Sequence, residues 1–178
     1  MRLFLVLVSL SLSARADWEG KLRFTHDPPR KGGGSDGAIH VKKGKVRIEE
    51  PTPLGPTVLL SDGKSLRLLL PEKKQVLELD AALGAAATVP PLSLKGMKEV
   101  GQEVLEGRPC TIWEDVRETK MGRIRQRLWV PEPGGKELMF LREVTQTDRG
   151  ATMADVSELR VRPQPDALFQ VPAGYSKK

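Results

Sequence analysis

The sequence predicts a mainly β fold made of about eleven antiparallel strands. Two observations lead to this prediction. Short segments in which apolar and polar residues alternate recur along the chain, and Gly, Pro, Asp and Lys separate them. Almost no stretch has the apolar spacing of a helix. Strands of this number and spacing are typical of an antiparallel sandwich, a barrel or a half-barrel.

The first half of the sheet is expected to consist of hairpins with recognisable turns. Gly44 supplies the positive φ that the turn between the second and third strands needs. The pair Asp62-Gly63 favours a hairpin between the fourth and fifth strands. Pro71 fixes φ at one position of the next turn, and the charged residues of that turn favour its exposure to solvent. The strands expected here cover residues 18–26, 38–41, 46–49, 57–60, 65–70 and 75–79.

The second half of the sheet is also expected to consist of strands separated by turns. A turn at residues 106–109 and a break at residues 131–135 separate strands expected over 98–104, 110–117, 123–130, 136–147 and 152–161. Alternation along the strand 123–130 gives two unlike faces. Ile124, Gln126, Leu128 and Val130 share a largely apolar face, while Arg123, Arg125, Arg127 and Trp129 share a basic one. The arginines either form a solvated strand face or meet anionic lipid headgroups or an acidic partner.

Residues 81–97 are apolar, rich in small side chains and the only candidate for a short helix. Two helical turns fit residues 81–87, and Pro90-Pro91 must end them. The segment is either a connector across the end of a sheet or a lid over an apolar cavity. In the tail, residues 163–178, the side chains of Phe169, Val171, Pro172 and Tyr175 either staple the C-terminus across the sheet or contact a ligand.

Residues 1–16 have the pattern of a secretory signal peptide, with a basic residue, an apolar core and Ala14 and Ala16 before a cleavage site. The apolar stretch is about ten residues long, against roughly 20 needed to span a bilayer. Cleavage after Ala16 removes two of the 29 basic residues and none of the 23 acidic ones, leaving a formal charge of +4. We therefore expect a soluble periplasmic protein with one domain over residues 17–178. No cysteine follows the cleavage site to carry a lipid anchor.

The residues favour a binding protein over an enzyme. Cys110, the single cysteine, opens a strand-like run and is expected to be buried. A metal site would need both histidines, His26 and His40, and they lack the spacing of a known ligand motif. Nucleophile and phosphate-loop motifs are absent from the sequence. We expect a monomer with no catalytic residues, no metal, no cofactor and no nucleic-acid partner. A secreted hydrolase is the least favoured hypothesis.

Four motifs occur in an order that resembles a known family. They are Gly44-Lys45-Val46-Arg47-Ile48-Glu49, Leu70-Pro71-Glu72-Lys73-Lys74, Gly107-Arg108-Pro109-Cys110-Thr111-Ile112-Trp113 and Leu168-Phe169-Gln170-Val171-Pro172-Ala173-Gly174-Tyr175. The chain resembles an uncharacterised family of secreted bacterial proteins related to the LolA/LolB-like superfamily of periplasmic lipoprotein carriers. The resemblance implies an unclosed half-barrel of about eleven antiparallel strands whose apolar face is covered by helices or loops. It also implies cargo of the kind handled in outer-membrane lipoprotein sorting, although this chain offers only residues 81–97 as a cover.

The resulting hypothesis is a periplasmic, non-enzymatic binding or carrier protein. Its partner would be a lipid, a lipoprotein acyl chain or another hydrophobic ligand, with transient contact to an anionic membrane surface. The alternative is an envelope structural or interaction module without a small ligand. The residues expected to line the ligand site are Leu66, Leu68, Leu70, Leu77, Leu79, Met97, Trp113 and Trp129.

Overall fold

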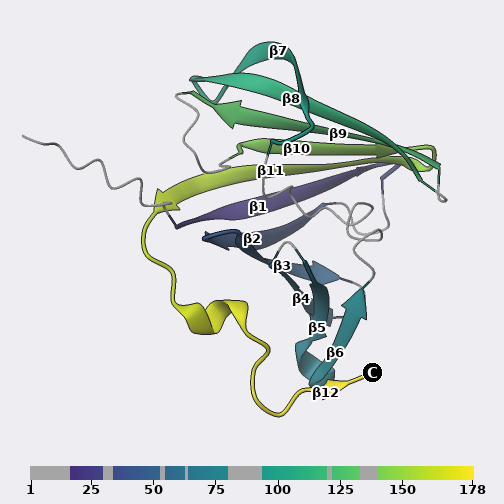
Figure 1. The fold of residues 1–178 in the computed structure, drawn as a ribbon, viewed down its shortest axis with the longest axis vertical. Helices are drawn as coiled ribbons and strands as arrows, with labels where there is room; N and C mark the ends of the chain where they lie inside the picture. Colours follow the sequence, from purple (N-terminus) through teal and green to yellow (C-terminus); the bar gives the residue numbers. More distant parts are fainter. Residues whose placement is uncertain are drawn as a thin grey trace, which may run out of the picture.

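The protein folds into one twelve-stranded sheet that does not close on itself (Figure 1). The structure is a computed structural model that describes residues 17–29, 34–52, 55–62, 64–79, 94–119, 122–132 and 140–178. The strands lie in the order β12-β6-β5-β4-β3-β2-β1-β11-β10-β9-β8-β7. The mainly β, unclosed half-barrel expected from the sequence is therefore confirmed.

Two antiparallel meanders make up the sheet. The first contains β1 (Trp18–Asp27), β2 (Ser35–Lys42), β3 (Lys45–Thr52), β4 (Gly55–Ser61), β5 (Leu66–Leu70) and β6 (Gln75–Leu79). The second contains β7 (Lys98–Leu105), β8 (Arg108–Thr119), β9 (Gly122–Pro131), β10 (Arg142–Thr147) and β11 (Gly150–Val161). Antiparallel pairing of β1 with β11 joins the two meanders, and Figure 1 shows these strands side by side in the middle of the sheet.

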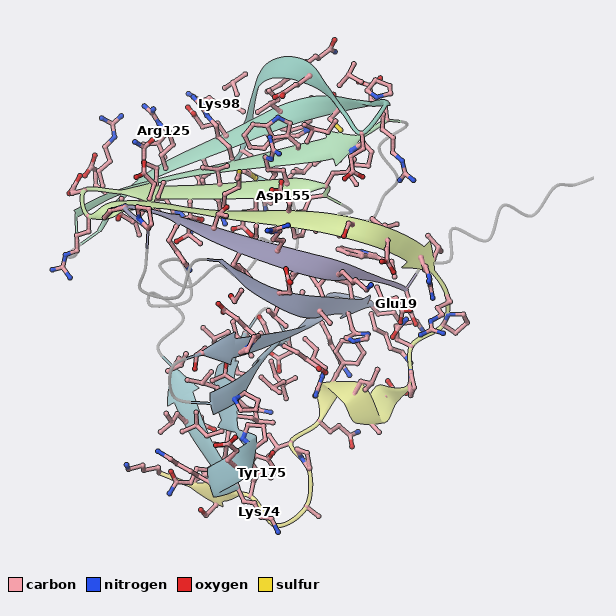
Figure 2. The ribbon with its side chains drawn as sticks, turned by 180° about the vertical axis from the view of Figure 1, so that it is seen from behind. Glu19, Lys74, Lys98, Arg125, Asp155 and Tyr175 are labelled. Carbon is pink, nitrogen blue, oxygen red and sulfur yellow. The ribbon has the colours of Figure 1, made fainter. Side chains whose placement is uncertain are left out.

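A twelfth strand, which the sequence did not indicate, comes from the C-terminal tail. The tail follows η2 (Asp166–Phe169) and ends in β12 (Ser176–Lys177), which pairs in parallel with β6. Ser176 N–H donates to the carbonyl of Lys74 over 2.9 Å. Lys74 itself follows the short η1 (Pro71–Lys73). The chain thus returns to the sheet edge formed about a hundred residues earlier, where Figure 2 shows Lys74 and Tyr175 close together.

One face of the sheet carries the main core, and we call it the core face. Cross-strand pairing places side chains of neighbouring strands on a common side. It puts Ile39 of β2, Ile48 of β3 and Leu59 of β4 in one row that begins opposite Gly20 of β1. Trp18 packs edge-on against Phe140, with ring centroids 5.9 Å apart. The buried members of this core are Trp18, Leu22, Phe24, Ile39, Val46, Ile48, Leu128, Val130, Phe140, Ala154 and Val156.

The opposite face carries two smaller apolar clusters. One consists of Val58, Leu60, Leu69 and Val76, and Val171 and Tyr175 of the tail pack against it. The tail therefore staples the first meander, which is one of the two roles considered for it. The other cluster contains Cys110, Trp129 and Leu141. Cys110 is only 1% exposed, so the expectation that it is buried is confirmed, and burial raises the pKa of its thiol.

The tenth strand begins later than expected. Residues 136–139 of the predicted strand lie outside the described residues, and the strand starts at Arg142. Leu141 packs with Trp129 on the opposite face, and Arg142 lies on the same face. The alternation of side chains is therefore broken between Leu141 and Arg142. Leu141 still bonds to both adjacent strands, because its N–H donates to the carbonyl of Trp129 and its carbonyl accepts from Val156 N–H.

Two expected segments lie wholly or largely outside the described residues. They are the signal peptide at residues 1–16 and most of the segment 81–97, of which the structure describes residues 94–97. Within the part of the chain that is described, no helix combines the length and apolar character needed to cross a membrane. The turn glycine Gly44 has the positive φ that the sequence indicated, at 79°.

Candidate binding face

Seven of the eight residues expected to line a ligand site lie on the core face or pack against it. Leu68 pairs with Leu59 of β4 and with Leu77 of β6, so the three leucines point to the same side. Leu66 pairs in the same way with Leu79. Trp113 pairs with the core residue Leu128. The register thus places the five leucines Leu66, Leu68, Leu70, Leu77 and Leu79 side by side on β5 and β6. Trp113 lies on the same face of the distant strand β8, and both Trp113 and Met97 pack against the main core.

Four of these leucines are only half-buried. Leu68, Leu70, Leu77 and Leu79 belong to none of the three apolar clusters formed by the described residues. They follow one another on the last two strands of the first meander, where alternation directs them to the core face. We call this set the leucine surface.

Trp129, the eighth residue, lies on the opposite face. Its indole Nε1 donates to Glu103 Oε2 over 2.7 Å, and the Arg142 guanidinium lies 5.8 Å from the ring centroid. Alternation along β9 places Trp129 with the arginines and away from Leu128, so it does not belong with the leucine surface. Its indole instead fixes β9 to the edge strand β7.

The core face also contains a polar row that the sequence did not reveal. Residues that face each other on five adjacent strands are Asp115, Gln126, Thr145, Thr152 and His26. The His26 Nδ1 and Thr152 Oγ1 atoms are 3.1 Å apart. On its own strand, none of these residues belongs to a motif that indicates a site. The row exists only because the register aligns all five.

Glu143 lies next to this row and is 1% exposed. Its Oε1 accepts hydrogen bonds from Gln126 Nε2 at 2.6 Å and from Thr145 Oγ1 at 3.3 Å. Gln126 Oε1 in turn accepts from Arg117 Nη2 at 3.0 Å, and Arg117 Nε forms an ion pair with Asp115 Oδ2 at 2.7 Å. We call these five residues the Glu143 cluster.

Glu143 combines a raised pKa with a buried oxygen that lacks a described hydrogen-bond partner. Burial raises the pKa of Glu143 to about 7, although its two hydrogen bonds and the charge of Arg117 act in the opposite direction. Its second oxygen, Oε2, is buried and has no hydrogen-bond partner among the described residues. A buried acceptor without a donor costs about 1–3 kcal/mol, so this atom needs an explanation.

Neighbouring carboxylates offset most of the positive charge on the basic face of β9. Arg127 and Arg125 lie 2.7 Å and 3.6 Å from Glu114 Oε2, and Arg123 lies 3.7 Å from Glu118. Arg125 and Lys98 lie at the same end of the molecule in Figure 2. Paired arginines attract an anionic surface less strongly than free ones do, so this face gives little support to membrane contact.

The two histidines lie near opposite ends of β1. His26 belongs to the polar row, whereas His40 pairs with Glu19 at the beginning of β1 and its Nδ1 lies 3.1 Å from Gln164 Oε1. They therefore do not converge on one site. Among the described residues, no group of three His, Cys, Asp or Glu side chains is placed to hold a metal ion.

Comparison with solved structures shows a fold shared with an uncharacterised protein. An uncharacterised conserved protein from Thermus thermophilus superposes with a TM-score of 0.59 at 13% identity, covering 93% of this chain and 91% of that one. The lipoprotein LppX from Mycobacterium tuberculosis gives a TM-score of 0.44 at 11% identity, covering 83% and 88%. A DUF1329 family protein from Desulfovibrio piger gives 0.44 at 16%, covering 88% and 90%. No family model and no curated protein sequence matches the chain.

Proposed function

We propose that the protein is a non-enzymatic binding or carrier protein for a lipid, a lipoprotein acyl chain or another hydrophobic ligand. The leucine surface is the observation that carries this proposal. Leu68, Leu70, Leu77 and Leu79 are half-buried on the face that holds the core, and they stand outside its packed clusters. The motif resemblance to the LolA/LolB-like superfamily supports the same role.

Binding on such a face depends on removing apolar area from water. Each methylene group that moves from water to an apolar surface contributes about 0.8 kcal/mol, which corresponds to roughly a fourfold gain in affinity. No covalent step is needed, and side-chain shape sets how much of an alkyl chain is covered. Affinity should therefore rise with chain length until the chain outgrows the surface.

The proposed place of action is the periplasm. The pattern of residues 1–16 supports export and cleavage after Ala16, which would release a chain starting at Asp17. A carrier released in this way crosses an aqueous compartment with its apolar cargo sheltered. The mass of the protein recovered from its own cell envelope tests the cleavage site.

A second candidate function is an envelope interaction module without a small ligand. The edge strand β7 favours it, because Val100 and Val104 are 48% and 65% exposed on that strand. Unpaired edge strands with apolar side chains can pair with another chain. Such a module would use β7 and would leave the leucine surface without a role.

Paired substitutions on the leucine surface separate the two functions. The cross-strand pair Leu68→Ser and Leu77→Ser, made together, should lower affinity for a ten-carbon alkanediol at least tenfold while the protein stays folded. Val104→Ser is the matched control, because this exposed valine lies on the edge strand. Equal affinity in the double variant and the control would contradict the proposed function.

A further inference from the structure

The Glu143 cluster places polar groups beside an apolar surface. Glu143 pairs across the sheet with the core residues Leu128 and Ala154, so apolar side chains flank it on both neighbouring strands. The polar row begins at the next position along β10 on that face, with Thr145. A ligand group that reaches this buried part of the core face would meet both an apolar region and a polar one.

We propose that the Glu143 cluster receives the polar end of an amphiphile and that this polar end carries a hydroxyl group. The inference rests on the proposed function, because it specifies which hydrophobic ligand the same face would take. It begins from Glu143 Oε2, a buried acceptor to which no described residue donates. A ligand hydroxyl would supply the missing hydrogen bond.

A hydroxyl group fits both protonation states of this carboxyl. With a pKa of about 7, Glu143 is present near neutral pH as an acid and as a carboxylate. A hydroxyl donates to the carboxylate and accepts from the acid, so it satisfies either form. A quaternary ammonium group has no N–H to donate, and an ionised sulfonate or phosphodiester oxygen can only accept.

The charges on this face also disfavour an anionic headgroup. The charged or titratable side chains that β8 and β1 direct toward this region are Asp115, Arg117 and His26. On the described core face, β9 and β11 contribute none. The single guanidinium is already paired with Asp115 over 2.7 Å, so ionised Glu143 would leave the cluster with excess negative charge.

The cluster is open to solvent on the side of β8. The side chains of Arg117 and Asp115 are 41% and 27% exposed, whereas Gln126 and Glu143 behind them are buried. Arg117 is therefore the outermost member, and rotation of its long side chain would admit a headgroup to Gln126 and Glu143. The threonine hydroxyls of the polar row extend the hydrogen-bonding surface behind it.

Two probes with the same ten-carbon chain test the inference. Decane-1,2-diol carries hydroxyls, and decane-1-sulfonate carries a permanent negative charge at every working pH. Affinities are measured by titration calorimetry at pH 6 and pH 8 for the wild type and for Glu143→Gln and Glu143→Leu. Glu106→Gln serves as the control, because Glu106 is exposed in the turn between β7 and β8.

The wild type should bind the diol at least tenfold more tightly than the sulfonate at pH 8, and this preference should shrink at pH 6 as Glu143 takes up its proton. Glu143→Gln should show no change in preference between the two pH values, and Glu143→Leu should bind the two probes within about threefold of each other. The control should behave as the wild type. Wild-type binding of both probes without a preference for the diol would overturn this inference alone. Failure of the wild type to bind either probe would overturn the proposed function together with it.

Discussion

Replacing Glu143 with glutamine should make the protein less sensitive to rising pH. In the folded protein, burial raises the pKa of Glu143 from 4.5 to about 7, whereas in the unfolded chain the side chain is solvated. Between pH 4.5 and about pH 7, the folded state therefore binds more protons than the unfolded state does. The free energy of unfolding of the wild type therefore falls as pH rises through this window.

The size of the effect follows from the change in pKa. A rise from 4.5 to about 7 corresponds to about 3 kcal/mol of stability that is present below pH 4.5 and is lost by about pH 8. Glutamine at position 143 cannot ionise, yet its amide oxygen can still accept the hydrogen bonds from Gln126 and Thr145. The variant should thus gain about 3 kcal/mol relative to the wild type between pH 4.5 and pH 8.

Urea unfolding at half-unit steps from pH 4.5 to pH 8 measures this difference. Glu106→Gln removes an exposed carboxylate and shows how much of the pH dependence comes from a change in net charge. If the stability profiles of Glu143→Gln and the wild type run parallel within about 1 kcal/mol, Glu143 does not ionise in this window and the reasoning is refuted.

Three further sets of substitutions test the packing. Tyr175→Ala should lower the free energy of unfolding by about 2 kcal/mol, measured in urea, because its ring packs on the apolar cluster under the tail; an unchanged midpoint would show that the tail contributes no stability. Gly37→Ala should cost more than about 2 kcal/mol or prevent folding, since a Cβ there would lie 2.1 Å from the Glu49 carbonyl oxygen. Gly107→Ala should lower the free energy of unfolding by only about 1 kcal/mol, because its surroundings are open and only its φ of 75° is unfavourable. Equal losses of stability in the two glycine variants would contradict the close approach of Gly37 to the Glu49 carbonyl oxygen. Trp129→Phe should cost about 1 kcal/mol through the lost bond to Glu103, and no loss in thermal unfolding would count against that bond.

The hairpins could be predicted because their signals are local. Gly44 and Pro71 fix turns within a few residues, and alternation then sets which side chains face the core. The same alternation separates Leu128 from Trp129, and applying it strictly would have kept Trp129 out of the expected ligand site. Trp129 was grouped with the leucines by residue type, although its strand position places it on the opposite face.

The Glu143 cluster and β12 could not be predicted from local signals. Glu143 meets Gln126 only through the register between β10 and β9, and Arg117 joins them from a third strand. Likewise, β12 is two residues long and is held by packing of Tyr175 against strands far back in the sequence. The pairing of β1 with β11 has the same long-range character, so the sequence indicated the strands but not which of them join the two meanders.

The most direct test of the central claim is native mass spectrometry of the wild-type protein isolated from its own cell envelope. We expect a bound species that is released on denaturation, partitions into organic solvent, and is identified by lipidomics as an amphiphile with an alkyl chain. Apoprotein alone, together with a panel of fatty acids, alkanediols and phospholipids that leaves the melting temperature unchanged, would contradict the claim that this face binds a hydrophobic ligand.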